Sequence, residues 1–290
     1  MPSLSPVFTS GFFSTCTVAL NQIILAYNNE REFPSLCTTS LMEWYKEDES
    51  LDSDIWEEFF KPSTHQFLNP SDFSEKITFT DFMNCDDGDF TYLGQFSPYE
   101  KIGYKDVLPI VNSYFSPSLK TRERVNFFLE KYGIDPDKTI GVYYRGNDKL
   151  MEANPPSYED YKERIEKVLA ENPGCKLLIQ TDEREFLNYA TSIYPESIFV
   201  QELPVIDKSY EWQVSWTIEN GKRTNFGIDF MSIALILSKC KRLILNSCNV
   251  SMWVCLYRGS SEGVDQYLNP RKYFYLNDYK YYFESENKWF

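Results

Sequence analysis

The chain is poor in the residues that build metal centres and nucleophilic triads. It has one histidine, His65, and its seven cysteines are scattered without a CxxC pair. Zinc sites need clustered Cys and His ligands, so no metal site is expected. The sequence also lacks a GxxxxGK[ST] stretch and a G-x-S-x-G partner for His65. These absences exclude a P-loop NTPase and a serine hydrolase with a nucleophile elbow.

Basic residues are also scarce, with 29 Lys and Arg against 43 Asp and Glu, for a net charge of −14. An acidic surface of this kind repels phosphate backbones and anionic lipids, so partners made of nucleic acid or membrane surface are disfavoured. A phosphorylated small molecule remains compatible where a few cations gather. Arg145, Lys149 and the pair Lys222 and Arg223 are the candidates.

Long apolar runs are missing. The best, residues 228–237, is too short for a membrane span and contains Asp229. The N-terminus has no basic segment followed by an uninterrupted apolar stretch, so no secretory signal is predicted. An odd number of cysteines in mostly apolar settings is typical of reduced thiols. Together these features predict a cytoplasmic protein.

Aromatic residues, by contrast, reach 17%, within a hydrophobic total of 42%. This is ample for packed interiors, and 290 residues fit two domains of ordinary size. A boundary near residues 132–136 predicts one domain over residues 1–135 and a second over 136–290.

The most informative segment is residues 139–149, TIGVYYRGNDK. Its β-branched and aromatic first six residues predict a buried strand, and Gly146 permits a sharp turn after it. In open α/β sheets ligands bind beyond the carboxyl ends of strands. Arg145 would there present a planar fork of donors that suits a diphosphate. A solvated turn with a local ion pair to Asp148 is the alternative interpretation.

The second half of the chain alternates between strand and helix patterns. Strands are predicted at residues 176–180, 197–200 and 241–245, with helices after residue 157, after residue 182, over about 225–239 and after residue 246. Ser157 followed by Asp160 is typical of a capping box. Repeated β-α units with apolar strands predict a parallel, doubly wound α/β sheet.

The first half is less regular. A short strand at residues 6–10, a tight loop at residues 11–14 and a helix over 17–27 would form a β-loop-α unit. Such a loop lets a backbone approach a phosphate, although most loops of this kind are only turns. The acidic residues 46–58 predict a solvated helix.

Three ordered motifs in the second half resemble the fucosyltransferase superfamily that includes α1,6-fucosyltransferases and protein O-fucosyltransferases. The family's Gly-Val-His-x-Arg-Arg-x-Asp-Lys motif is matched by residues 141–149, GVYYRGNDK. A strand ending in Thr-Asp is matched by residues 178–182, LIQTD. A helix with an early Asp, then a strand and a Ser-rich turn, is matched by GIDFMS at 227–232 and ILNSCNV at 244–250. The Gly11 loop is similar to the opening of these enzymes.

The resemblance implies a GT-B-like architecture, with two Rossmann-like domains whose parallel sheets face a cleft. It implies an inverting glycosyltransferase that needs no metal or other cofactor and moves a sugar from a nucleotide donor, GDP-fucose first, to a glycan hydroxyl. Arg145 would anchor the diphosphate, and Tyr143 would stand beside the nucleotide. Further donor contacts would come from Gly11, Phe12, Asp229, Ser247, Cys248 and Asn249.

Direct displacement at the anomeric carbon calls for a general base, and Glu152 and Asp148 are the candidates. Structural interpretations stay open beside these roles. Glu152 has the alternative of a surface carboxylate, and Asp148 that of an ion pair or turn cap. Asp229 has the alternative of complementing backbone N–H groups in its first helical turn, and residues 247–249 that of a helix cap.

The chain departs from the family pattern at two positions. The second Arg of the pair is Gly146, and the motif's His is Tyr143. These changes leave two alternatives to GDP-fucose transfer. One is a glycosyltransferase with another donor, such as a UDP-pentose or another GDP-sugar. The other is a non-catalytic carbohydrate- or nucleotide-binding module on a degenerate fold.

Overall fold

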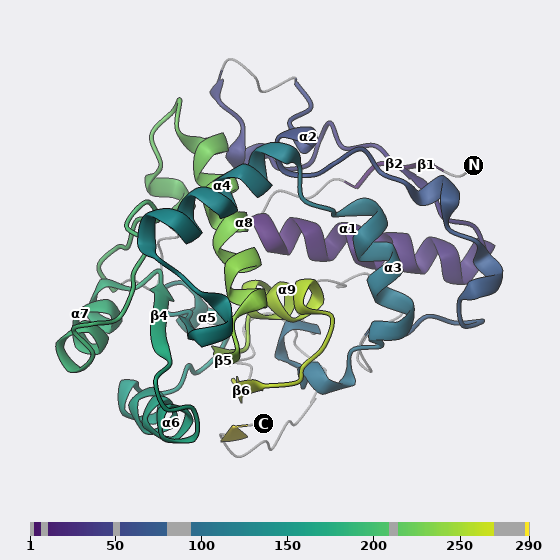
Figure 1. Cartoon of the computed structure of the whole chain (residues 1–290). Coiled ribbons are helices and arrows are strands. Elements are labelled where there is room, and N and C mark those ends of the chain that lie inside the picture. Colours follow the sequence, from purple (N-terminus) through teal and green to yellow (C-terminus); the bar gives the residue numbers. More distant parts are fainter. Residues whose placement is uncertain are drawn as a thin grey trace.

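A computed structural model describes residues 3–6, 11–48, 53–79, 94–208, 214–269 and 288–289, without the side chains of Met151, Glu152 and Lys288. Its central feature is a five-stranded sheet with the order β4-β3-β5-β6-β7 (Figure 1). The strands are β4 (Lys176–Thr181), β3 (Thr139–Tyr144), β5 (Arg242–Asn246), β6 (Val264–Leu268) and β7 (Lys288–Trp289). The first four are mutually parallel and β7 is antiparallel to β6. The predicted parallel α/β sheet is thus present.

β3 lies between β4 and β5, and all six of its residues are buried. Side chains alternate between the two faces of a strand. Ile140, Val142 and Tyr144 accordingly join one hydrophobic cluster, whereas Tyr143 joins another. The strand therefore delivers residue 145 to the carboxyl edge of a sheet that is covered on both faces.

One face of the sheet is covered by α6 (Tyr158–Glu171) and α7 (Arg184–Ile193). The predicted capping box forms at the start of α6, where Ser157 and Asp160 bond each other's backbone N–H. The other face packs against a cluster that includes α8 (Arg223–Lys239) and α9 (Asn249–Arg258) (Figure 1). Further from the sheet, α1 (Phe12–Glu30) and α3 (Tyr104–Tyr114) pack against α9, and α4 (Leu119–Tyr132) packs against α8.

The first half of the chain contains little sheet. Before residue 136, the strands of the described ranges are β1 (Ser3–Leu4) and β2 (Ser35–Leu36), a parallel pair of two residues each. Side chains of α1 and α3 share one hydrophobic cluster with those of α8 and α9. A second Rossmann-like domain and an interdomain cleft are therefore not confirmed, and the division into residues 1–135 and 136–290 stays a prediction.

Three local predictions need correction. Residues 197–200 form no strand, because only Ile198 pairs with the sheet, through a single parallel bridge to Leu178. The helix predicted over 17–27 begins earlier and ends later, as α1. The described residues 46–48 and 53–58 do not form a solvated helix: Lys46 and Trp56 are buried, and the short α2 (Trp56–Phe59) packs against α8. The strand predicted at residues 6–10 falls mostly outside the described residues.

Two short segments matter for the site. α5 (Lys149–Glu152) follows the turn after β3, and the 3-10 helix η5 (Gly94–Phe96) lies near it. Within the described residues, no helix combines the length and the apolar character that crossing a membrane requires.

Candidate functional site

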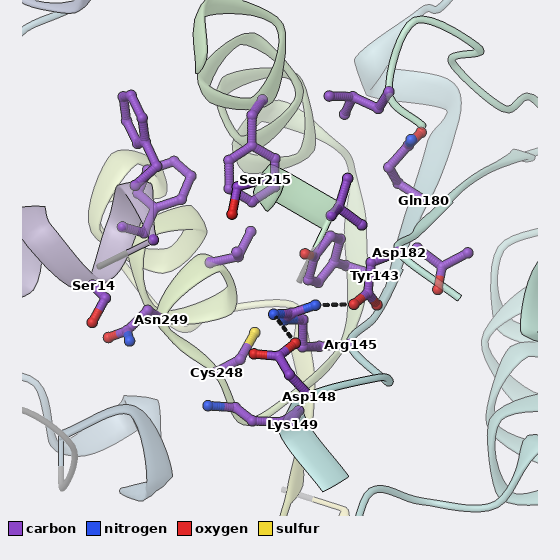
Figure 2. A pocket seen from close by; sticks show the side chains of 18 of the residues that line it. Ser14, Tyr143, Arg145, Asp148, Lys149, Gln180, Asp182, Ser215, Cys248 and Asn249 are labelled. Atoms are coloured by element: carbon purple, nitrogen blue, oxygen red, sulfur yellow. Dashed lines mark hydrogen bonds and ion pairs between the residues drawn. The ribbon is translucent and has the colours of Figure 1, made fainter. Parts of the chain in front are cut away.

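A cavity of about 160 Å³ lies at the carboxyl edge of the sheet, where ligands of open α/β folds bind. Its walls come from the ends of β3 and β4, the starts of α1 and α9, and aromatic residues of the first half and of α8 (Figure 2). The lining includes Gly11, Phe12, Ser14, Tyr45, Gln95, Tyr143, Arg145, Asp148, Lys149, Asp182, Phe226, Phe230, Cys248 and Asn249. Residues from both sides of position 136 thus share one pocket.

Arg145 is fixed in this pocket by two carboxylates. Its guanidinium bonds Asp148 at 2.5 Å and also pairs with Asp182, as the dashed lines in Figure 2 show. The Arg145 side chain is only 18% exposed. The ion pair with Asp148 does form, but it lies in the pocket wall rather than on a solvated turn. The clamp sets the direction of the guanidinium, and the two carboxylates also balance its charge.

Asp182 and Glu183 hold the turn that carries Arg145. The Gly146 N–H donates to Asp182 Oδ1 at 3.0 Å, and the side-chain Nδ2 of Asn147 donates to the Asp182 carbonyl at 2.7 Å. A Cβ on Gly146 would collide with the Glu183 carboxylate, which is fully buried. From the sequence, Asp182 was predicted only as the end of a strand, in the Thr-Asp motif, and not as a site residue. Its position at the end of β4, beside β3, is the signal that would have placed it in the site.

Asn246, at the end of β5, fixes the backbone of Arg145. The Arg145 N–H donates to Asn246 Oδ1 at 2.8 Å, and Asn246 Nδ2 donates to the Arg145 carbonyl at 3.0 Å. The hydroxyl of Tyr161 lies 3.2 Å from the same Oδ1. Asn246 is completely buried, so these bonds have no competition from water.

Replacing Asn246 with leucine is expected to weaken binding of any ligand held by Arg145 by roughly tenfold or more, since the main chain of Arg145 loses both partners. A destabilisation of about 1–3 kcal/mol is also expected from the unpaired buried groups. Asn172→Leu is the matched control, because Asn172 is buried and donates to the Val168 carbonyl at 2.9 Å, away from the pocket. Equal ligand affinity in both variants, measured by titration calorimetry, would contradict a positioning role for Asn246.

Two tyrosines contribute neutral hydroxyls. Burial raises the pKa of Tyr143 and of Tyr45 well above the ordinary range, so both phenols stay protonated. Tyr45 accepts a hydrogen bond from the Phe12 N–H at 2.9 Å and thereby anchors the start of α1. Tyr143 lines the pocket where the sequence placed it.

The starts of α1 and α9 meet at the pocket. Gly11 is the N-cap residue of α1 and Cys248 that of α9. The two helices are joined by Trp253, whose indole N–H donates to Thr17 Oγ1 at 2.9 Å, and Thr17 also contacts Asn249 at 3.0 Å. Unpaired N–H groups and the helix dipole make helix N-termini favourable places for anions.

Ser247 does not reach the pocket. It is fully buried behind it, where its hydroxyl donates to the Tyr267 carbonyl at 3.1 Å and accepts from Gln266 Nε2 at 3.1 Å. Of the predicted Ser-rich turn, Cys248 and Asn249 line the pocket and Ser247 supports it. Cys248 is also a helix cap, as the alternative interpretation predicted, since Ser251 N–H points at its Sγ.

Asp229 lies elsewhere, which argues against the predicted donor contact. It borders a separate hollow between α4 and α8. Both of its oxygens bind the Arg124 guanidinium, at 2.5 and 3.0 Å. Burial raises the pKa of Asp229, and Arg124 partly opposes that rise. The resemblance implied a donor contact for Asp229, but the partner that the structure shows is an arginine 105 residues earlier in the chain.

Glu152 is the last candidate from the sequence. It ends α5, but its side chain lies outside what the structure describes. Among the described residues, no group of three or more His, Cys, Asp or Glu side chains is placed to hold a metal ion.

No protein-family model matches the chain. No curated protein sequence matches it either. Among solved structures, it is similar to the NodZ α-1,6-fucosyltransferase soaked with GDP-fucose, with 15% identity, a TM-score of 0.37 and coverage of 51% of this chain and 45% of that one. The same enzyme co-crystallised with GDP gives 14% identity, a TM-score of 0.38 and coverage of 55% and 47%. The structure of fucosyltransferase NodZ from Bradyrhizobium gives 14% identity, a TM-score of 0.32 and coverage of 54% of this chain and 46% of that one. The chain spans about half the length of these proteins, and at such low TM-scores the case for function rests on the site itself.

Proposed function

We propose that this chain is an inverting, fucosyltransferase-like glycosyltransferase that transfers a sugar from a nucleoside-diphosphate donor to a glycan hydroxyl. GDP-fucose is the favoured donor. The observation that carries the proposal is the Arg145 guanidinium, held by two carboxylates at the carboxyl end of the inner strand β3, inside a pocket bordered by two helix N-termini. Fixed donors of this kind suit a diphosphate.

In the proposed reaction, a base removes the proton of the acceptor hydroxyl while its oxygen attacks the anomeric carbon. The bond from that carbon to the diphosphate oxygen breaks, and the nucleoside diphosphate leaves with the electron pair. Arg145 and the N-terminus of α9 stabilise the charge that develops on the leaving group. Because side chains and backbone supply this stabilisation, the scheme requires no metal ion.

Asp148 and Glu152 remain the two candidates for the base. Asp148 lines the pocket and gives one oxygen, Oδ1, to Arg145. Asp182 is less suited, because Arg145 and the Gly146 N–H engage both of its oxygens. With Asp148 as the base, Asp148→Asn retains donor binding and lowers turnover by roughly 100-fold or more, whereas Glu152→Gln leaves turnover unchanged. The reverse pattern in a transfer assay would assign the role to Glu152.

The experiment that tests the proposed function is a panel of nucleotide sugars assayed by thermal shift and then by transfer. A ligand that binds only the folded protein raises its melting temperature. Selective stabilisation by GDP-fucose, followed by its transfer, is the expected result. Selective stabilisation by another GDP-sugar or by a UDP-pentose would identify that nucleotide sugar as the donor instead of GDP-fucose. The absence of any shift across the panel would remove the proposal.

A non-catalytic binding module is the second candidate, and one observation favours it. The second cation of the family motif is missing, because residue 146 is glycine, and the Glu183 carboxylate occupies the space beside it. In addition, Asp148 and Asp182 balance the charge of Arg145. For this candidate, a donor would bind yet be neither transferred nor hydrolysed with any acceptor.

A further inference from the structure

The pocket contains a second group of polar side chains, besides those assigned to the donor. Ser14 lies in the first turn of α1 and is 9% exposed, and Gln95 lies on η5 and is fully buried. Both line the pocket, and neither Ser14 Oγ nor Gln95 Nε2 has a hydrogen-bond partner within the described part of the chain. Buried polar atoms left without partners are costly, so two of them in one pocket indicate a missing ligand.

The orientation of the Gln95 amide is determined by Lys149. Lys149 Nζ donates to Gln95 Oε1 at 2.7 Å, and the ammonium also lies 5.0 Å from the centre of the Phe96 ring. Turning the amide over would place two donors against each other. The unpaired atom of Gln95 is therefore an N–H donor, and it stands next to a cation.

Hydrogen bonds place Gln95, and the part of α1 that carries Ser14, near one region, the first turn of α9. The Tyr99 hydroxyl contacts the Gln95 carbonyl at 3.3 Å and both the N–H and the carbonyl of Cys248 at 3.1 Å. Thr17, one turn after Ser14 on α1, contacts Asn249 at 3.0 Å. Ser14, Asn249, Lys149 and Cys248 all line the pocket, and Figure 2 draws them in the same part of it.

We propose that Ser14, Gln95 and Lys149 form a second oxyanion subsite, which binds a carboxylate, sulfate or phosphate group of the acceptor. A hydroxyl, an amide N–H and an ammonium, beside the N-terminus of a 19-residue helix, favour an anionic oxygen. Ser14 and Gln95 belong to the first half of the chain, the predicted acceptor side, and Arg145 already serves the donor. Assignment of the anion to the acceptor rests on the proposed function, whereas the subsite itself does not.

Inorganic sulfate is the probe for the subsite, titrated at constant ionic strength with and without saturating GDP, with the melting temperature as the readout. Wild-type protein is expected to be stabilised by sulfate in both conditions. In Gln95→Glu, a carboxylate keeps the bond to Lys149 but repels the anion, so sulfate affinity falls roughly tenfold or more. Ser14→Ala removes one hydroxyl and is also expected to lower sulfate affinity. This second variant keeps the test valid if the Gln95→Glu protein does not fold.

Two control variants separate specific binding from general salt stabilisation. Ser197→Ala removes another buried hydroxyl that lacks a partner among the described residues but lies outside the pocket lining, so it retains the full sulfate effect. Arg145→Lys is likewise expected to retain the stabilisation by sulfate, while it loses the stabilisation by GDP. Sulfate stabilisation that is identical in wild-type, Gln95→Glu and Ser14→Ala proteins would overturn the subsite.

The source of the anion is decided by competition and by acceptor choice. If saturating GDP abolishes the sulfate effect, the subsite holds a donor phosphate and the acceptor assignment is wrong. If it persists, transfer assays should give a lower KM for acceptors that carry a sulfate or carboxylate than for their neutral counterparts, and Gln95→Glu should reverse that order. A Gln95-dependent sulfate effect in a protein that binds no nucleotide sugar would leave the subsite standing and remove the proposed function.

Discussion

Arg145→Lys is expected to lose most of the thermal stabilisation that a nucleoside-diphosphate donor gives, with an affinity lower by roughly 30-fold or more. Lysine keeps the positive charge between Asp148 and Asp182, so the fold is retained. The guanidinium of arginine is a planar fork that can bind two carboxylates and still offer N–H groups to a diphosphate, and the lysine ammonium lacks this geometry. The measurement is a donor titration followed by melting temperature or calorimetry.

The matched control for this variant is Arg184→Lys. Arg184 binds Asp207 at 2.6 Å, with both side chains at least half exposed to solvent. Exposed ion pairs contribute little, so donor affinity and stability should stay close to wild type. If Arg145→Lys binds the donor as tightly as Arg184→Lys does, the diphosphate is not held by residue 145.

For the variant Gly146→Arg, the family resemblance and the structure predict opposite effects on donor binding. The family motif has Arg at this position, so the motif alone predicts that restoring it tightens donor binding. The structure predicts the opposite, because any Cβ here meets the carboxylate of Glu183, which also lies 3.4 Å from the Asn147 N–H and bonds the Tyr158 hydroxyl. Displacing that carboxylate would disturb the turn that carries Arg145, with an expected loss of about 1–3 kcal/mol in stability and of most donor binding.

Gly146→Ala tests the same space without adding a charge, and it should fail in the same way. Melting temperature and donor titration of both variants are the measurements. Tighter donor binding in Gly146→Arg, with unchanged stability, would mean that Glu183 moves aside freely and that the family arrangement is accessible to this chain.

The parts of the site that could be predicted are those written in one continuous stretch of sequence. Residues 139–149 predict a buried strand that ends before an arginine at the edge of the sheet. The structure contains this strand as β3, and Arg145 follows it and lines the pocket. What holds Arg145 could not be read in the same way. Its partners Asp182 and Asn246 lie 37 and 101 residues away, at the carboxyl ends of the neighbouring strands, and their proximity to Arg145 can be seen only once the strand order is known.

Asp229 illustrates the opposite error. A lone carboxylate in an apolar helix requires a partner, and that physical argument holds. The sequence pattern does not reveal which neighbouring element supplies the partner, and α4 supplies it through Arg124. The first half could not be predicted well because its core is made of aromatic contacts between short segments, such as Phe12 with Tyr45 and Phe59, which have no strand or helix periodicity.

The indole of Trp253 has a consequence for how the pocket meets an anion. By joining α9 to α1 through Thr17, it sets the mutual angle of the two helix ends before any ligand arrives. The electric field at the pocket is therefore built during folding, and binding a negatively charged group requires little reorientation of the surrounding dipoles.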